Sequence, residues 1–202
     1  MKEVNIYRPA LDYSANESYK SLRTNLLFCG EEKKVIAITS CTPNEGKSTV
    51  SLNLALSLAD SGKKVLLIDA DLRKSVLLGR TEVDQEIKGL SHLLSHQETI
   101  ENVIYATNIP RFNIIYAGTV PPNPAELLGS KYFKRFLSAI RKVYDYVIID
   151  SPPLGVVIDA VIIGQYSDGA VIVIEQGVIK RKVVQDVIKQ LKKGEVRILG
   201  AV

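Results

Sequence analysis

The feature that most constrains this chain is the stretch from residue 35 to residue 73, VIAITSCTPNEGKSTVSLNLALSLADSGKKVLLIDADLR. A short apolar run, VIAI, leads into a turn that contains Pro43 and Gly46, and a segment with helical periodicity begins at Lys47. A second apolar run, VLLI, then ends at Asp69. This order predicts a strand, a phosphate-binding loop, a helix and a second strand.

The predicted loop has the chemistry of a phosphate site. Backbone amides at a helix N-terminus carry partial positive charge and bind phosphate oxygens. Lys47 adds a point charge for the outer phosphates, and the Ser48 hydroxyl is placed to ligate Mg2+. We expect the nucleotide to contact the loop and the first helical turn, which comprise Thr42, Pro43, Asn44, Glu45, Gly46, Lys47, Ser48 and Thr49.

Two other interpretations of this loop are weaker. Cys41 stands where a phosphate loop usually begins with glycine, so a Gly-Lys-Ser turn that only caps a helix is the plainer alternative. A Rossmann-type dinucleotide site would use Asp69 as a ribose ligand, but it needs a GxGxxG turn that TSCTPNEGK does not supply. The strand before the loop, the helix after it and the acidic end of the second strand together favour phosphate binding.

Composition limits the class of protein. The chain has 202 residues, of which 46% are hydrophobic, and this suits one globular domain. It contains no apolar run of the ~18 to 20 residues that a membrane span needs, and MKEVNIYRP lacks the apolar stretch of a secretory signal. Two cysteines outside any ligand cluster indicate a reduced, cytoplasmic protein. A net charge of +4 does not argue for nucleic acid as a partner.

Apolar runs alternate with helical segments along the chain. Strands are expected at 35–38, 64–69, 112–116, 146–150, 170–175 and 198–202. Helices are expected at 14–28, 47–61, 89–94, 100–105, 124–128, 130–144, 157–166 and 180–193, with an irregular arm at 1–13 and a loop with short helical pieces at 74–88. This alternation predicts an α/β fold with a doubly wound, mainly parallel sheet flanked by helices.

Three carboxylates fall at or just past the carboxyl ends of apolar strands, namely Asp69, Asp71 and Asp150. Ligands of an open α/β sheet bind outside those ends, so the three acids should converge on one nucleotide. We expect Asp150 and Asp71 to hold Mg2+ and Asp69 to accept a proton from an incoming hydroxyl. Arg73 would brace the carboxylates or neutralise phosphate charge. The plainer alternatives are helix caps for the acids and a surface position for Arg73.

The first expected helix carries a regular charge pattern. Ser14 and Glu17 fit a capping box that starts it, and Glu17, Lys20 and Arg23 then recur every three residues. From periodicity alone this is a solvated face with intrahelical ion pairs. His92 and His96 lie four residues apart, but without an acidic or sulfur ligand nearby they read as surface or core histidines.

Several motifs together resemble the bacterial tyrosine kinases of capsule and exopolysaccharide synthesis (BY-kinases). TSCTPNEGKST is similar to the Walker A motif of that family, VLLIDADLRK to its second motif, Walker A′, and YVIIDSPP to its Walker B motif. PPNPAELL also occurs there, and an N-terminal ExxRxxRTN element is matched by Glu17, Lys20, Arg23, Thr24 and Asn25. The resemblance covers nearly the whole chain.

The resemblance implies a P-loop NTPase fold of the MinD/ParA-like type and MgATP-dependent phosphorylation of protein tyrosine. This includes autophosphorylation between subunits and regulation of capsular or exopolysaccharide synthesis and export. The catalytic residues would be Lys47, Asp69, Asp71 and Arg73, and the metal ligands Ser48, Asp71 and Asp150.

The resemblance also implies partners and a location. A transmembrane adaptor of the polysaccharide co-polymerase type would activate the protein and recruit it from the cytoplasm to the inner face of the cell membrane. Glu17, Lys20 and Arg23 would join subunits into a ring such as an octamer. The whole chain, 1–202, would then be one kinase domain, with an arm and oligomerisation helix at 1–30 and a nucleotide-binding core at 31–202.

Some residues depart from the family pattern. Lys20 replaces an arginine and cannot reproduce its bidentate contact, which predicts weaker ring assembly. Ser75 replaces a proline, which predicts a looser loop beyond Arg73. The chain stops within the strand expected at 198–202, which we expected to be buried, before any tyrosine-rich tail. A truncated chain with an incomplete adenine pocket is therefore expected.

Two rival functions stay open on the sequence alone. A switch ATPase of the MinD/ParA kind carries a signature lysine near the start of the phosphate loop, and here that position is Thr42. A pseudo-enzyme that only uses the loop for assembly is the other rival, and the intact set of Lys47, Ser48 and the three acids argues against it.

Overall fold

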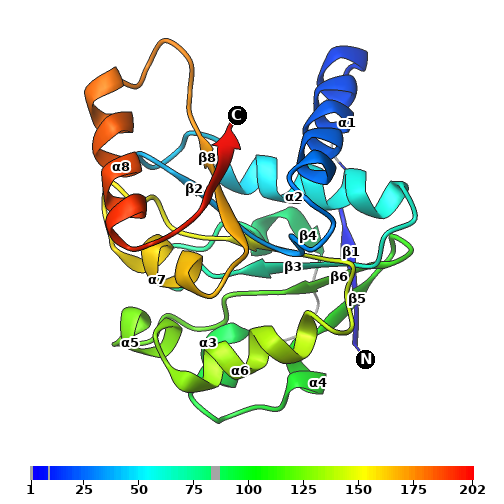
Figure 1. Ribbon diagram of the computed structural model, residues 1–202. Coiled ribbons are helices and arrows are strands. Elements are labelled where there is room, and N and C mark those ends of the chain that lie inside the picture. Colours follow the sequence, from blue (N-terminus) through cyan, green and yellow to red (C-terminus); the bar gives the residue numbers. More distant parts are fainter. Residues whose placement is uncertain (1, 9, 83–86) are drawn as a thin grey trace.

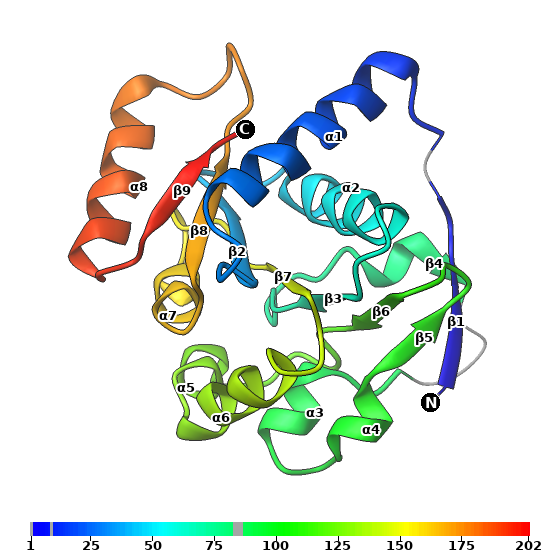
Figure 2. The same cartoon turned by 45° about the vertical axis from the view of Figure 1, so that its right-hand side comes forward.

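The computed structural model describes residues 2–8, 10–82 and 87–202. Within these residues nine strands form one sheet in the order β4-β1-β5-β6-β3-β7-β2-β8-β9 (Figures 1 and 2). Only the β1–β4 and β5–β6 pairs among them are antiparallel, so the expected mainly parallel sheet is confirmed. The strands are β1 (Lys2–Ile6), β2 (Val35–Ser40), β3 (Val65–Asp69), β4 (Thr81–Glu82), β5 (Tyr105–Thr107), β6 (Phe112–Ile115), β7 (Tyr146–Asp150), β8 (Gly169–Val173) and β9 (Ile198–Ala201).

Helices cover both faces of this sheet, as Figure 2 shows. Helices α1 and α2 pack on one face, and α3, α5, α6, α7 and α8 pack on the other. The helices are α1 (Tyr13–Phe28), α2 (Lys47–Asp60), α3 (Leu90–Leu94), α4 (Ile100–Val103), α5 (Pro124–Leu128), α6 (Lys131–Ile140), α7 (Asp159–Gln165) and α8 (Arg181–Lys193), with a 3-10 turn at Leu78–Arg80.

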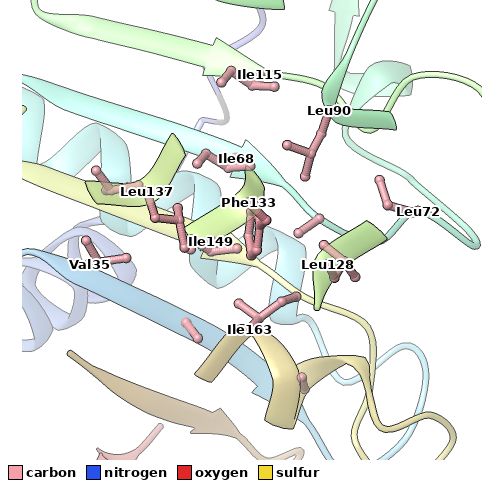
Figure 3. Packing of buried hydrophobic residues seen from close by; sticks show 14 of the residues in the cluster. Val35, Ile68, Leu72, Leu90, Ile115, Leu128, Phe133, Leu137, Ile149 and Ile163 are labelled. Carbon is pink, nitrogen blue, oxygen red and sulfur yellow. The ribbon is translucent and has the colours of Figure 1, made fainter. Parts of the chain in front are cut away.

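The central strands are buried on both faces because their apolar runs leave no polar side. In β2, Val35 and Ala37 face the core under α6 and α7, whereas Ile36 and Ile38 face the core under α1 and α2. Figure 3 shows Phe133 of α6 directed toward the sheet within the first of these cores. The two cores hold the middle strands rigidly, and the functional edge depends on those strands.

The register of the middle strands brings two acids to the same level. β3 and β7 are parallel neighbours, and Asp69 at the end of β3 is paired directly with Asp150 at the end of β7. β2 lies on the other side of β7, with Ile38 paired to Asp150. The loop that leaves β2 after Ser40 therefore starts beside both carboxylates.

The expectation of an irregular arm at residues 1–13 is wrong, because the arm contains a strand. β1 pairs with β5 and β4, and its buried residues alternate, with Val4 and Ile6 inside. The short alternating pattern KEVNI is a strand signal that the charged neighbours masked. The capping box is also wrong, since Asp12 caps α1 by accepting a hydrogen bond from the Ala15 amide at 2.7 Å.

Three further segments differ in detail. The helix expected at 100–105 ends at Val103, and β5 begins two residues later because Tyr105 is buried and pairs in the sheet. The expected loop at 74–88 includes the two-residue strand β4, and its residues 83–86 lie outside the described residues. β9 is half-buried to exposed rather than buried, with Gly200 and Ala201 at the surface.

Candidate active site

The phosphate loop is shaped by backbone conformation at its end. Gly46 has φ +85°, a left-handed conformation that glycine adopts without strain, and α2 begins at the next residue. The amides of the first turn of α2 therefore face outward at the carboxyl edge of the sheet. A Cβ at Gly46 would meet nothing within 4 Å, so the backbone angle, and not crowding, is what favours glycine there.

Charged and hydroxyl groups from α2 and from the ends of β3 and β7 converge on this loop. Lys47 Nζ lies 3.4 Å from Asp71 Oδ2 and 3.3 Å from Ser48 Oγ. Ser51 Oγ, one helical turn further along α2, donates to Asp150 Oδ1 at 3.1 Å. Both acids are buried, with Asp71 5% exposed and Asp150 1% exposed. A hydroxyl and two carboxylates are the oxygen ligands that Mg2+ prefers, so these residues fit a magnesium ion.

Asp69 lies deepest in the site. Its carboxylate accepts hydrogen bonds from Ser75 Oγ and, at 3.2 Å, from the Asp71 amide. Burial, followed by the neighbouring charge of Asp150, raises the pKa of Asp69 from its usual 3.8 to about 8. Burial also raises the pKa of Asp150, opposed by the charge of Lys47. The site thus holds two acids whose charged forms are costly until a cation joins them.

Ser75 ties the loop beyond Arg73 back to the site. The replacement of proline by serine predicts a looser loop, but the Ser75 hydroxyl donates to Asp69. The Asp71 carboxylate adds two backbone contacts, from the amides of Arg73 at 3.3 Å and Lys74 at 3.0 Å. The loop is therefore fastened to both acids through local hydrogen bonds.

Arg73 makes an ion pair that the sequence analysis did not anticipate. Its Nε and Nη2 atoms donate to the two oxygens of Asp159 at 2.8 and 3.0 Å. Asp159 is fully buried in the first turn of α7, and the hydrogen bonds to it raise the pKa of Arg73. The signal that could have found Asp159 is an acid at the start of a helix shortly after the strand that ends at Asp150.

Two of the expected nucleotide contacts brace the loop instead of lining a cavity. Glu45 is buried and accepts hydrogen bonds from the Thr42 amide, from Thr42 Oγ1 at 2.9 Å and from the Glu175 amide at 3.2 Å. These contacts join the phosphate loop to the segment that follows β8. Thr42 and Glu45 therefore act on the shape of the loop.

A cavity of about 430 Å³ opens over the loop and Asp71, whereas the buried Asp69 and Asp150 lie outside its lining. This is within the range of small-molecule sites. Of the residues predicted to bind the nucleotide, those that line it are Pro43, Asn44, Gly46, Lys47, Ser48 and Thr49. Asp71 and Arg73 line it as well, and the remainder of the lining comes from Lys74, Val76, Pro152, Pro153, Val156 and Val157.

Comparison with known proteins identifies the family. Residues 33–198 match the model of the AAA domain family. Tyrosine-protein kinase CpsD of Streptococcus agalactiae is 45% identical over 186 residues, which cover 92% of this chain and 81% of that protein. The chain belongs to the bacterial tyrosine-protein kinases.

Solved structures separate this kinase from the switch ATPases. The kinase domain of Escherichia coli tyrosine kinase ETK has a TM-score of 0.87 and 36% identity, over 93% of this chain and 74% of that chain. The cell division ATPase MinD of Pyrococcus furiosus has a TM-score of 0.69 and 28% identity, over 84% and 70%. The expected P-loop NTPase fold is confirmed, and the kinases are the nearer of the two groups.

The residues predicted to join subunits lie away from the cavity, on α1. Lys20 Nζ and Glu17 Oε1 form an exposed ion pair at 2.7 Å. Arg23 Nη1 instead donates to the Ser57 carbonyl on α2 at 2.6 Å, so part of the motif binds within the chain. A contact between subunits through these residues stays a prediction.

The two histidines lie in the core and at the surface, as expected. His92 is buried and its Nδ1 accepts from the Gly89 amide at 3.1 Å, while the His96 ring lies 4.4 Å from that of Tyr132. Among the described residues, neither histidine joins a cluster of metal ligands.

In the part of the chain that the structure describes, no helix combines the length and the apolarity that a membrane span requires.

Proposed function

We propose that this protein is a MgATP-dependent kinase that transfers the γ-phosphoryl group of ATP to tyrosine hydroxyls of proteins and acts in capsular or exopolysaccharide synthesis. The observation that carries the proposal is the convergence of Lys47, Ser48, Asp71 and the Asp69–Asp150 pair on one phosphate loop. Its relatives, named as tyrosine-protein kinases, support the class of acceptor.

Phosphoryl transfer needs positioning and charge compensation more than covalent chemistry from the protein. The amides of the loop and Lys47 would hold the β- and γ-phosphates. Ser48, Asp71 and Asp150 would hold Mg2+, which supplies positive charge to the phosphate oxygens. Arg73 lines the cavity while its Nε and Nη2 donate to Asp159, and its charge would help to compensate an anionic ligand there.

Asp69 is suited to receive the phenolic proton. A proton acceptor works best when its pKa lies near the working pH, and burial raises the pKa of Asp69 to about 8. Ser75 Oγ and the Asp71 amide orient the carboxylate from two sides. The tyrosine oxygen would approach the γ-phosphorus from the side of this carboxylate.

The partners follow from the family. We propose that a transmembrane adaptor of the polysaccharide co-polymerase type activates this protein and recruits it from the cytoplasm to the inner face of the membrane. Subunits would assemble as a ring, such as an octamer, and phosphorylate one another in trans. The exposed Glu17–Lys20 pair on α1 supports a role for that helix face in assembly, with residues 31–202 as the nucleotide-binding core.

The decisive experiment is incubation with labelled ATP, Mg2+ and a tyrosine-bearing peptide. Phosphotyrosine on the peptide is the expected product, and chelation of Mg2+ should abolish it. ATP hydrolysis that is stimulated by DNA or lipid, without phosphotyrosine, would identify a switch ATPase and overturn the proposal.

A further inference from the structure

The cavity lining combines the phosphate loop and the charged residues Asp71, Arg73 and Lys74 with a set of apolar residues. Val76, Val156 and Val157 line it together with Pro152 and Pro153. Val76 is 47% exposed and Val156 61% exposed, although both are apolar. A triphosphate and its cation make no use of such a wall, so this part of the cavity calls for an apolar ligand group.

Sheet topology places the apolar wall on one side of the phosphate loop. Val76 follows β3 and Val156 follows β7, and both strands lie on the same side of β2 in the sheet order. The strand on the other side of β2 is β8. Asp69 and Asp71 also follow β3, so the wall stands on the side of the loop where the proton acceptor lies.

Hydrogen bonds of the residues next to Val76 and Val156 hold both segments in position. Ser75, next to Val76, donates to Asp69. Gly155, next to Val156, donates its amide to the Cys41 carbonyl at 3.0 Å. A Cβ at Gly155 would lie 2.1 Å from that oxygen, so the close approach requires glycine.

The two segments are also joined to each other. Arg73 lies three residues before Val76, and Asp159 lies three residues after Val156. Their two-fold hydrogen bond, at 2.8 and 3.0 Å, links the segment after β3 to the start of α7. Asp159 is fully buried, so the link is anchored in the core and sets the spacing of the segments that carry the two valines.

We propose that Val76, Val156 and the adjoining Pro153 form the subsite for the aromatic ring of the acceptor tyrosine, with the Arg73–Asp159 pair as the latch that sets its width. This inference rests on the proposed kinase function. In the step it serves, the phenolic oxygen bonds to the γ-phosphorus while the bond from that phosphorus to the β–γ bridging oxygen breaks. The phenolic proton passes to Asp69, and ADP leaves.

Val76→Ser and Val156→Ser test the subsite, with Val143→Ser as the matched control because Val143 is 55% exposed beyond α6 and outside the cavity lining. Each cavity variant should raise the KM for a tyrosine peptide roughly fivefold, since ring contact is lost, with kcat at saturating peptide unchanged. MgATP affinity, measured by calorimetry, should stay within about twofold of the parent. The control should match the parent in both quantities.

Asp159→Asn tests the latch without substituting a residue that lines the cavity. It retains the size of the side chain but weakens the hold on Arg73, and it should also raise the peptide KM more than it changes MgATP affinity. Circular dichroism of all variants should match the parent.

The outcomes separate the subsite from the function on which it rests. If the parent forms no phosphotyrosine, the proposed function fails and the subsite fails with it. If the parent is active but peptide KM is unchanged in both valine variants, the subsite alone is overturned. A fall in MgATP affinity with an unchanged peptide KM would assign the wall to the nucleotide base and overturn it equally.

Discussion

The carboxyl edge of the sheet and the outer face of α1 both carry charge, but under opposite conditions. At the edge, Asp69 and Asp150 are 0% and 1% exposed and lie beside each other in register. On α1, the side chains of Lys20 and Glu17 are 48% and 44% exposed and pair with each other. Buried charges are costly unless compensated, whereas exposed pairs contribute little. The difference indicates that the buried acids at the edge lower the stability of the fold and are kept for their chemistry, whereas the exposed pair on α1 carries no such cost.

This contrast predicts that a change at the edge alters activity far more than stability. Lys47→Met should lower tyrosine phosphorylation by roughly 100-fold or more, because a charge on the outer phosphates is lost. The fold should be retained, since Lys47 lines the cavity and its Nζ contacts Asp71 and Ser48 within the site. Labelled phosphate on a peptide measures the first effect, and circular dichroism the second.

Lys182→Met on the exposed face of α8 is the matched control and should leave both quantities unchanged. Full activity in a folded Lys47→Met protein would show that this lysine does not bind the phosphates.

Away from the edge, the N-terminal segment should respond in stability instead. Ile6 is 3% exposed in β1, so Ile6→Ala should lower the free energy of unfolding by about 2 to 4 kcal/mol. Glu3→Ala on the exposed side of the same strand should lower it by less than about 0.5 kcal/mol. Urea unfolding of both variants measures the difference. Equal values would mean that β1 is not packed on the sheet in solution.

The cost of burying Asp69 at the edge can be measured from the pH dependence of the free energy of unfolding. The pKa of Asp69 is raised to about 8 in the folded protein, against 3.8 for a free side chain, so between these values the folded state holds a proton that the unfolded state has released. Stability of the nucleotide-free protein should therefore fall as pH rises through this window. Asp69→Asn removes the titration and should be more stable than the parent at pH 9, by roughly 1 to 3 kcal/mol, with the advantage vanishing near pH 4.

Thermal or urea unfolding at several pH values, with metal chelated, checks this sign. Asp186→Asn on exposed α8 is the control, and it should follow the parent at every pH. A parent whose stability rises from pH 5 to pH 9 relative to Asp69→Asn would show that Asp69 is charged in the free protein.

The contrast between the edge and the rest of the molecule also explains which parts of the fold and the site the sequence predicts. The edge was predictable because strand ends, the GKST turn and the acids at Asp69, Asp71 and Asp150 are local signals whose convergence follows from parallel pairing. Asp159 carries a local signal, an acid at the start of an expected helix, but its pairing with Arg73, 86 residues away in sequence, leaves no local pattern. β1 was missed because charged neighbours mask its short alternating pattern, and Val4 and Ile6 are buried by pairing with the distant β5 and β4. Where the structural role of a residue depends on a neighbour that is distant in sequence, periodicity alone does not predict that role.

The smallest effects on stability are expected on α1, and they separate its two neighbouring cations. Arg23 Nη1 donates to the Ser57 carbonyl at 2.6 Å, so Arg23→Ala should lower the free energy of unfolding by about 1 kcal/mol. Lys20→Ala loses only an exposed pair within the helix and should lower it by no more than ~0.5 kcal/mol. If α1 also joins subunits, Lys20→Ala should nevertheless move size-exclusion elution of an oligomeric parent toward monomer, because its effect on assembly is independent of its effect on the fold. An elution profile that shifts only for Arg23→Ala would attribute the change to the packing of α1 on α2. An unshifted profile for the double variant, Lys20→Ala with Arg23→Ala, would show that this face of α1 is exposed to solvent and joins no subunits.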